Sequence, residues 1–128
     1  MELIVRICWL LVALVHSPPA AVLFAPQLVE QLYGVSAVGE TGVLIVHRGA
    51  LFLAILTAAL FATFDIHSRR LASIVAAVSM IGFLFVYLRA GSPAGPLRTI
   101  ALMDAIALLP LTFAGWRAWT PSRGQRIN

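Results

Sequence analysis

Charged residues are scarce in this sequence of 128 residues. Only 11% of the side chains are charged, whereas a soluble domain carries roughly a quarter. Hydrophobic residues make up 61% of the chain, so there are too few polar side chains to cover a water-exposed surface. These two fractions exclude a soluble enzyme and a disordered segment, and they indicate an integral membrane protein.

Cysteine occurs once, as Cys8, and lysine does not occur. A single cysteine excludes an intramolecular disulfide, a redox pair of cysteines and a zinc site built from thiolates. The nine basic residues are all arginines, and they do not form the contiguous basic patch that a nucleic-acid-binding surface needs. We therefore expect that nucleic acid is not a partner of this protein.

Four long apolar runs divide the chain. They cover residues 3–25, 43–64, 71–89 and 97–119. Each run is close to the roughly 20 residues with which a helix crosses a bilayer. We expect residues 1–128 to form one domain, an all-α membrane protein folded as a bundle of four transmembrane helices. In the first outer loop, residues 27–34 carry apolar side chains at helical spacing and end in Gly34, which predicts a short interfacial helix.

The positions of the arginines indicate the orientation in the membrane, because short cytoplasmic loops are enriched in positive charge. Four spans place both termini on the same side. That side carries six arginines, Arg6, Arg69, Arg70, Arg117, Arg123 and Arg126. The opposite side carries three, one of them inside a span. We therefore expect a multi-pass membrane protein with its N- and C-termini in the cytoplasm.

A secretory signal peptide is an alternative interpretation of the first 25 residues, because Arg6 is followed by a nine-residue apolar core. The segment before Gln27 has Leu23 where signal peptidases prefer a small residue. This position favours the interpretation of the segment as a transmembrane span.

Polar side chains occur in all four spans, and their positions place them together in the outer half of the bundle. Arg48 lies about 9 Å, and Asp104 about 10 Å, from the outer end of its span at 1.5 Å per residue. Because a charge in hydrocarbon is costly without a partner, we expect an ion pair between them. The alternative is that the long side chain of Arg48 extends to the outer interface. The remaining candidates for this cluster, or for a ligand pocket around it, are His16, His47, Tyr87 and Arg98.

The two histidines within the spans are expected to have structural roles. His16 precedes Pro18 and Pro19, whose missing N–H groups free backbone carbonyls, and we expect its ring to satisfy that kink. His47 shares a helix face with Ala50, which predicts that it points into the bundle. Two histidines at unmatched spacing are a weak signal for haem or metal, so we expect no cofactor and no metal site.

Short segments in four places carry a pattern beyond hydrophobicity. They are Leu32-Tyr33-Gly34, Val46-His47-Arg48-Gly49-Ala50-Leu51-Phe52, Ser79-Met80-Ile81-Gly82-Phe83-Leu84 and Leu97-Arg98-Thr99-Ile100-Ala101-Leu102-Met103-Asp104. In this order they resemble a family of small bacterial membrane proteins with four spans, similar to DoxX-like bundles, and the likeness covers about residues 3–111. The resemblance implies a location in the bacterial inner membrane and implies that these segments are the family's signature.

Members of that family often carry the label phosphopantetheine adenylyltransferase. That enzyme is a soluble α/β nucleotidyltransferase with a Gly-rich, His-containing nucleotide motif, and this sequence has no segment that could bind a triphosphate. The resemblance therefore supplies no activity, ligand or catalytic residue.

Three classes of function remain open. We favour a non-catalytic protein, either a subunit of a larger membrane complex or a binder of a lipid or quinone-like apolar ligand in the outer half, because one sparse polar cluster is too little for most catalysis. The second class is a small transporter or proton pathway that uses Arg48, Asp104 and His47. The third is an intramembrane enzyme with a histidine base and Arg48 as an anion clamp. Membrane lipid, a larger complex and a second copy of the chain are the expected partners.

Overall fold

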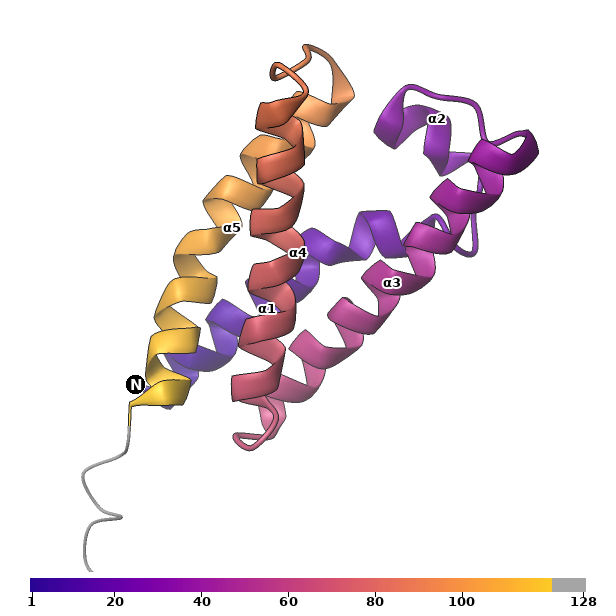
Figure 1. Ribbon diagram of the computed structural model, residues 1–128. Coiled ribbons are helices and arrows are strands. Elements are labelled where there is room, and N and C mark those ends of the chain that lie inside the picture. The colour runs from indigo at the N-terminus through magenta and orange to yellow at the C-terminus, as the bar shows by residue number, and fades with distance from the viewer. Residues whose placement is uncertain (121–128) are drawn as a thin grey trace, which may run out of the picture.

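A computed structural model describes residues 1–120, and this part of the chain folds into five α-helices without a β-strand. The helices are α1 (Glu2–Ala21), α2 (Leu28–Tyr33), α3 (Gly39–Phe64), α4 (Arg69–Arg89) and α5 (Pro96–Trp119) (Figure 1). All but α2 are long and apolar enough to cross a membrane. The predicted fold class, four transmembrane helices and a short additional helix in the first loop, is confirmed. Arg123 and Arg126 of the topology prediction lie outside the described residues.

The helix ends follow from the residues that stand there. Gly34 ends α2 in the left-handed conformation, with φ of 69°, and its N–H donates to the carbonyl of Glu30. Pro96 starts α5 in its first turn, where its missing N–H has no cost. The helix α3 starts at Gly39, four residues before the predicted span, because hydropathy detects only the apolar part of a helix.

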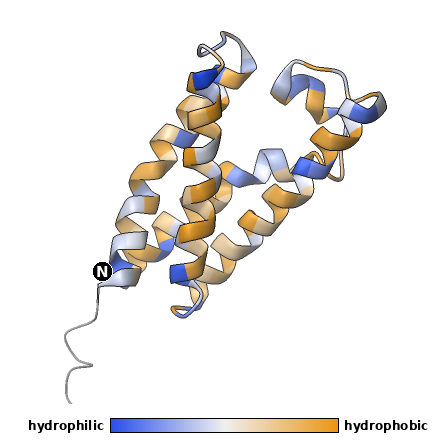
Figure 2. Ribbon diagram, viewed as in Figure 1, coloured by the Kyte–Doolittle hydropathy of each residue, from blue (hydrophilic) through white to orange (hydrophobic). Residues whose placement is uncertain are grey.

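Apolar side chains fill the interior and also cover the outside of the long helices. Trp9, Val12 and Met80 are completely buried among α1, α4 and their neighbours. Large apolar residues such as Leu14, Val43 and Leu109 are more than 60% exposed. Figure 2 shows this hydrophobic cover along the helices, with hydrophilic residues gathered toward their ends. Such a surface suits the hydrocarbon of a bilayer and would be unfavourable in water.

Helix α1 packs against α3 and α5, and α4 packs against the same two helices. The contact between α1 and α3 is close at Gly49. A Cβ atom at this position would lie only 2.8 Å from the backbone nitrogen of Leu23. Glycine therefore allows α3 to approach the chain at the end of α1.

One end of the bundle, which carries both the N-terminus and the turn between α3 and α4, is held by polar contacts. The carboxylate of Asp65 accepts hydrogen bonds from the backbone N–H groups of His67 (3.0 Å) and Ser68 (3.1 Å), which hold the pKa of Asp65 below its usual range. Arg69 is almost fully buried and binds the carboxylate of Glu2 with two nitrogens. We call this end the terminal end and the opposite one the α2 end.

Candidate functional site

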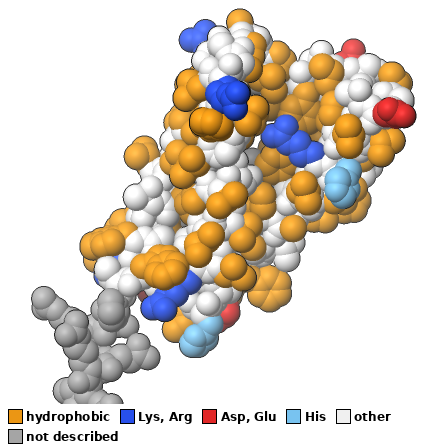
Figure 3. Space-filling model, in the orientation of Figure 1, with side chains coloured by type: hydrophobic (Ala, Val, Ile, Leu, Met, Phe, Trp, Pro, Cys, Tyr) orange, Lys and Arg blue, Asp and Glu red, His pale blue; other side chains and the backbone are white. Residues whose placement is uncertain are grey.

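The candidate site lies toward the α2 end, where the bundle opens. Figure 1 shows that α3 and α4 diverge toward this end, so that the bundle has two arms, one with α2 and α3 and the other with α4 and α5. Figure 3 shows a hollow between these arms with arginine atoms beside it. Arg48 is nine residues from the start of α3 and Asp104 is eight from the start of α5. At 1.5 Å per residue these positions are about 14 Å and about 12 Å along their helices.

The guanidinium group of Arg48 is surrounded by aromatic rings. Its central carbon lies 5.1 Å from the ring centroid of Phe52, 5.4 Å from that of Phe83 and 5.9 Å from that of Tyr33. These rings come from α3, α4 and α2, respectively, and all are within the distance of a cation–π interaction. We call this arrangement the Arg48 cage. Within residues 1–120, the side chain of Arg48 has neither a hydrogen bond nor an ion pair.

The predicted ion pair between Arg48 and Asp104 is wrong for the part of the chain that the structure describes. Asp104 is half-buried and close enough for the charge of Arg48 to act on its carboxyl group, but the two side chains make no direct contact. The reason is the packing order, since α5 packs against α1 and α4 rather than α3. The guanidinium of Arg48 instead lies among three aromatic rings, which attract it.

Tyr33 lies near both charges. The pKa of its hydroxyl is raised, mainly because the group is buried. The positive charge of Arg48 opposes this shift, and the negative charge of Asp104 adds to it. The tyrosine belongs to α2, the short helix in the loop. This helix therefore contributes one wall of the cage and brings a polar hydroxyl group to the two charged side chains.

His16 is buried and contacts the cage through Phe52, with 5.9 Å between the two ring centroids. Its Nδ1 lies 2.8 Å from the carbonyl oxygen of Val12, so this nitrogen carries the proton and donates. The kink is satisfied differently from the prediction. The carbonyl of Leu14, which Pro18 leaves without a backbone donor, accepts a hydrogen bond from the hydroxyl of Ser17 at 2.8 Å.

His47 is exposed, so the prediction that it points into the bundle is wrong. The buried face of α3 is set by Gly49, which packs against the backbone of Leu23. His47 lies two residues earlier and is rotated by about 200° from Gly49 around the helix. The shared face with Ala50 was a misleading signal, because small residues occur on both sides of this helix.

Two further candidates lie beside the cage rather than in it. Arg98 is exposed in the first turn of α5, which removes it from the predicted buried cluster. The hydroxyl of Tyr87 donates to the carbonyl of Pro93 at 3.1 Å and so ties the end of α4 to the following loop. Its ring stacks on that of Phe83, with 6.2 Å between centroids, and supports this wall of the cage.

The aromatic residues of the cage were missed by the sequence analysis. Phe52 had a usable signal, because residues four apart share a helix face and it follows Arg48 at that spacing. Tyr33 and Phe83 had none, since they come from other elements and only the fold brings them to the arginine.

Among residues 1–120, no three His, Cys, Asp or Glu side chains come together as a metal site requires. The arrangement instead offers a cation with free N–H donors, aromatic walls and a nearby carboxyl group. No family model, curated protein or solved structure matches this chain. The resemblance to DoxX-like bundles therefore stays a prediction.

Proposed function

We propose that this chain is a non-catalytic membrane protein that binds an amphipathic ligand, a lipid or a quinone-like molecule, at the Arg48 cage. The observation that supports the proposal is the environment of Arg48, whose guanidinium has no hydrogen-bond acceptor within the described residues although it lies deep along α3. Arg48 is half-buried. A cation at this depth without an acceptor is unfavourable, and a bound ligand with oxygen atoms would supply one.

The chemistry of the cage indicates which ligand it suits. Arginine offers five N–H donors and no acceptor, so it selects carbonyl, carboxylate or phosphate oxygens. The rings of Tyr33, Phe52 and Phe83 suit a flat or apolar body next to those oxygens. The gap between the arms of the bundle gives such a molecule access from the surrounding hydrocarbon (Figure 3). A quinone ring or the head region of a lipid meets these requirements.

The alternatives from the sequence have less support in this geometry. A proton pathway was based on a pair of Arg48 and Asp104 with His47 beside it, but the pair makes no contact and His47 is exposed. An intramembrane enzyme would need a base at the cage, and the ring of His16 is buried behind Phe52 with Nδ1 bound to a backbone carbonyl. We therefore favour binding over transport or catalysis.

The proposed location is a bacterial inner membrane, with the protein acting as a subunit of a larger complex or as a homo-oligomer. The terminal end carries the exposed arginines Arg6, Arg70 and Arg117, and the α2 end carries Arg89 and Arg98. Together with Arg123 and Arg126 of the sequence, this excess supports a cytoplasmic terminal end. The cage would then open in the outer half of the membrane.

Binding at the cage can be tested with Arg48→Leu. Titration calorimetry with a short-tailed ubiquinone, and mass spectrometry of lipids and quinones that co-purify in mild detergent, measure occupancy. Loss of charged hydrogen bonds should weaken quinone binding about tenfold or more and remove the co-purifying species. Arg89→Leu, an exposed arginine at the same end, is the matched control and should bind as the wild type does. Equal binding by Arg48→Leu and the wild type would contradict the proposal.

The orientation can be tested by labelling single cysteines in intact cells with a membrane-impermeant maleimide. Cys8, which is buried, is first replaced with alanine. Ser92→Cys in the exposed α4–α5 loop should be labelled in intact cells, and His67→Cys in the exposed α3–α4 turn only after lysis. The reverse pattern would show that the terminal end faces outward.

A further inference from the structure

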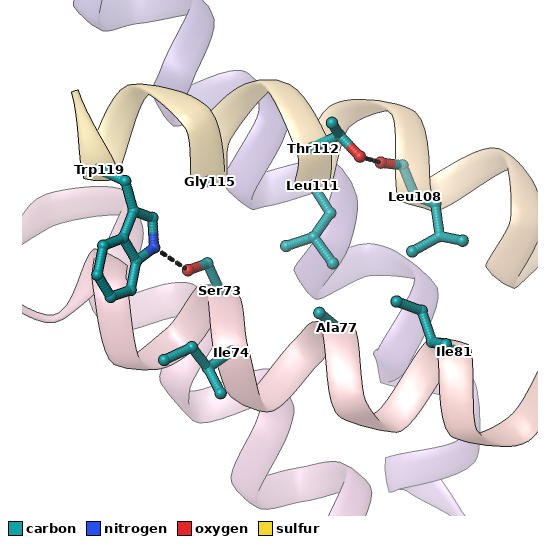
Figure 4. A pocket seen from close by; sticks show the side chains of 9 residues that line it. All are labelled: Ser73, Ile74, Ala77, Ile81, Leu108, Leu111, Thr112, Gly115 and Trp119. Carbon is teal, nitrogen blue, oxygen red and sulfur yellow. Dashed lines mark hydrogen bonds between the residues drawn. The ribbon is translucent and has the colours of Figure 1, made fainter.

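A second feature lies on the opposite half of the bundle, on the outside of α4 and α5. A groove of about 310 Å³ runs between these helices (Figure 4). Its walls are mainly apolar and include Ala77, Ile81, Leu108 and Leu111. Ile81 is more than half exposed, so the groove is open to the surroundings of the bundle. It is independent of the Arg48 cage.

The polar groups in the groove are already engaged. The hydroxyl of Ser73 accepts a hydrogen bond from Nε1 of Trp119 (3.2 Å) and donates to the carbonyl of Arg70 (2.7 Å). The hydroxyl of Thr112 donates to the carbonyl of Leu108 (2.7 Å), as Figure 4 also shows. The groove therefore offers an apolar surface without a free polar group to fix a polar ligand, which suits a hydrocarbon chain.

The length of the groove fits one leaflet of a bilayer. Along α4 it runs from Ser73 to Ile81, and along α5 from Leu108 to Trp119. At 1.5 Å per residue these stretches are about 12 Å and about 16 Å long, close to half of the roughly 30 Å of hydrocarbon. The groove begins at the terminal end and finishes near the middle of the bundle, where an acyl chain of that leaflet also finishes.

A cation and an interfacial aromatic residue lie at the terminal end of the groove. The guanidinium carbon of Arg70 is 5.3 Å from the ring centroid of Trp119. Its Nε donates to the carbonyl of Ala118 at 3.0 Å, which holds the side chain in place. Within residues 1–120 its two terminal nitrogens make no hydrogen bond, so both can donate to a ligand. Tryptophan is typical of the membrane interface, and arginine at this level attracts anionic head groups.

We propose that this groove holds one acyl chain of an anionic phospholipid whose phosphate binds the exposed guanidinium of Arg70. The apolar walls, the length of one leaflet and the cation at the head-group level each match one part of that molecule. A transmembrane helix of a partner protein would use the apolar walls but would leave the positive charge without a function.

The test is native mass spectrometry of the full chain in detergent, titrated with phosphatidylglycerol or with phosphatidylcholine of the same acyl chains. The wild type should bind phosphatidylglycerol about fivefold more tightly, the usual contribution of one arginine near anionic lipid. Arg70→Gln should remove this preference. Arg89→Gln, at the other end of the same helix, should keep it. Equal binding of both lipids by the wild type would overturn the proposal.

The groove itself is tested by Ala77→Leu, which fills it. Exclusion of two methylene groups of the acyl chain should weaken the binding of both lipids about tenfold. Gly82→Leu is the matched control on the same helix, because a Cβ there meets no heavy atom within 4 Å in residues 1–120. Unchanged binding by Ala77→Leu would overturn the proposal. Arg70 is exposed and lies outside the apolar core, so Arg70→Gln tests the head-group site even if Ala77→Leu does not fold.

Two other occupants would be recognised in the same experiment. Displacement of the bound lipid by inorganic phosphate would show a site for a free anion and would overturn the acyl-chain assignment. A dimer that is present in the wild type and in Gly82→Leu but lost in Ala77→Leu would show that a second copy of the chain fills the groove. Retention of bound lipid on a monomer in added phosphate is the outcome that we expect.

Discussion

Gly49→Ala should lower the stability of the bundle by about 3 kcal/mol, the upper end of the usual cost of overpacking. The added Cβ would lie 2.8 Å from the backbone nitrogen and 3.3 Å from the Cα of Leu23. A flexible side chain could move away from such a contact, but backbone at the end of α1 cannot do so without shifting one helix against the other. The measurement is helical circular dichroism during titration of the detergent-solubilised protein with a denaturing detergent.

Gly82→Ala is the control, and it should act in the opposite direction. Gly82 is an exposed residue of α4, and within the described residues an added Cβ has no neighbour closer than 4 Å. Replacing an exposed helical glycine with alanine reduces the conformational entropy of the unfolded chain and should stabilise by about 0.5 to 1 kcal/mol. Similar effects of the two substitutions would contradict the close approach at Gly49.

Gly49→Ala should also weaken ligand binding at the Arg48 cage, although Gly49 does not belong to the cage. The glycine precedes Ala50 and follows Arg48 on α3, so a displaced α3 moves the guanidinium relative to Phe83 on α4 and Tyr33 on α2. The calorimetric titration described for Arg48→Leu measures this effect. Gly82→Ala should leave quinone binding unchanged.

The helices could be predicted from the sequence because few backbone structures are stable in a bilayer. A segment that crosses hydrocarbon must satisfy its backbone polar groups internally, so long apolar runs have to be helices. The length of each run then determines the spans to within about four residues at either end, as for the start of α3 at Gly39. Gly34 ends α2 for a local conformational reason that needs no knowledge of the fold, and Pro96 starts α5 for a reason of the same kind.

The depth of the candidate site was predictable, but the directions of its side chains were not. Depth depends only on the rise per residue, so Arg48 and Asp104 lie at similar distances from the starts of α3 and α5. Direction depends on which face of α3 packs against its neighbour, and the close contact at Gly49 decides it. The spacing of residues alone does not identify that face, and His47 is therefore exposed although the sequence predicts it inside the bundle.

The partners of the arginines depend on long-range packing, which counting residues does not reveal. Arg69 and Arg70 are adjacent, and the sequence predicts both on the same side of the membrane. In the structure Arg69 is buried against Glu2 and the carbonyl of Ala62, whereas Arg70 is exposed beside Trp119. Successive residues of a helix point about 100° apart, so two identical side chains came to have different roles.

Replacing Arg69 with alanine should destabilise the bundle by about 2 to 3 kcal/mol, within the range for a charged hydrogen bond and below that for a fully buried pair. Only 7% of the Arg69 side chain is exposed, and Nε donates to the carbonyl of Ala62 at 2.9 Å, near the end of α3. Two further nitrogens bind the carboxylate of Glu2 at the start of α1. The substitution leaves the carbonyl of Ala62 without this donor and removes the polar contacts that join α1, α3 and α4 at this end.

Arg6 provides a matched control, because it binds the same carboxylate from an exposed position. Its Nε lies 3.3 Å from Oε1 of Glu2, and its side chain is 47% exposed. Arg6→Ala should therefore cost only about 0.3 to 0.5 kcal/mol, the usual value for an exposed pair four residues apart. Combining each variant with Glu2→Gln in a double-mutant cycle should give the larger coupling for Arg69. Equal couplings for the two arginines would mean that burial adds nothing to the contact between Glu2 and Arg69, and that the helices at the terminal end are held by apolar packing alone.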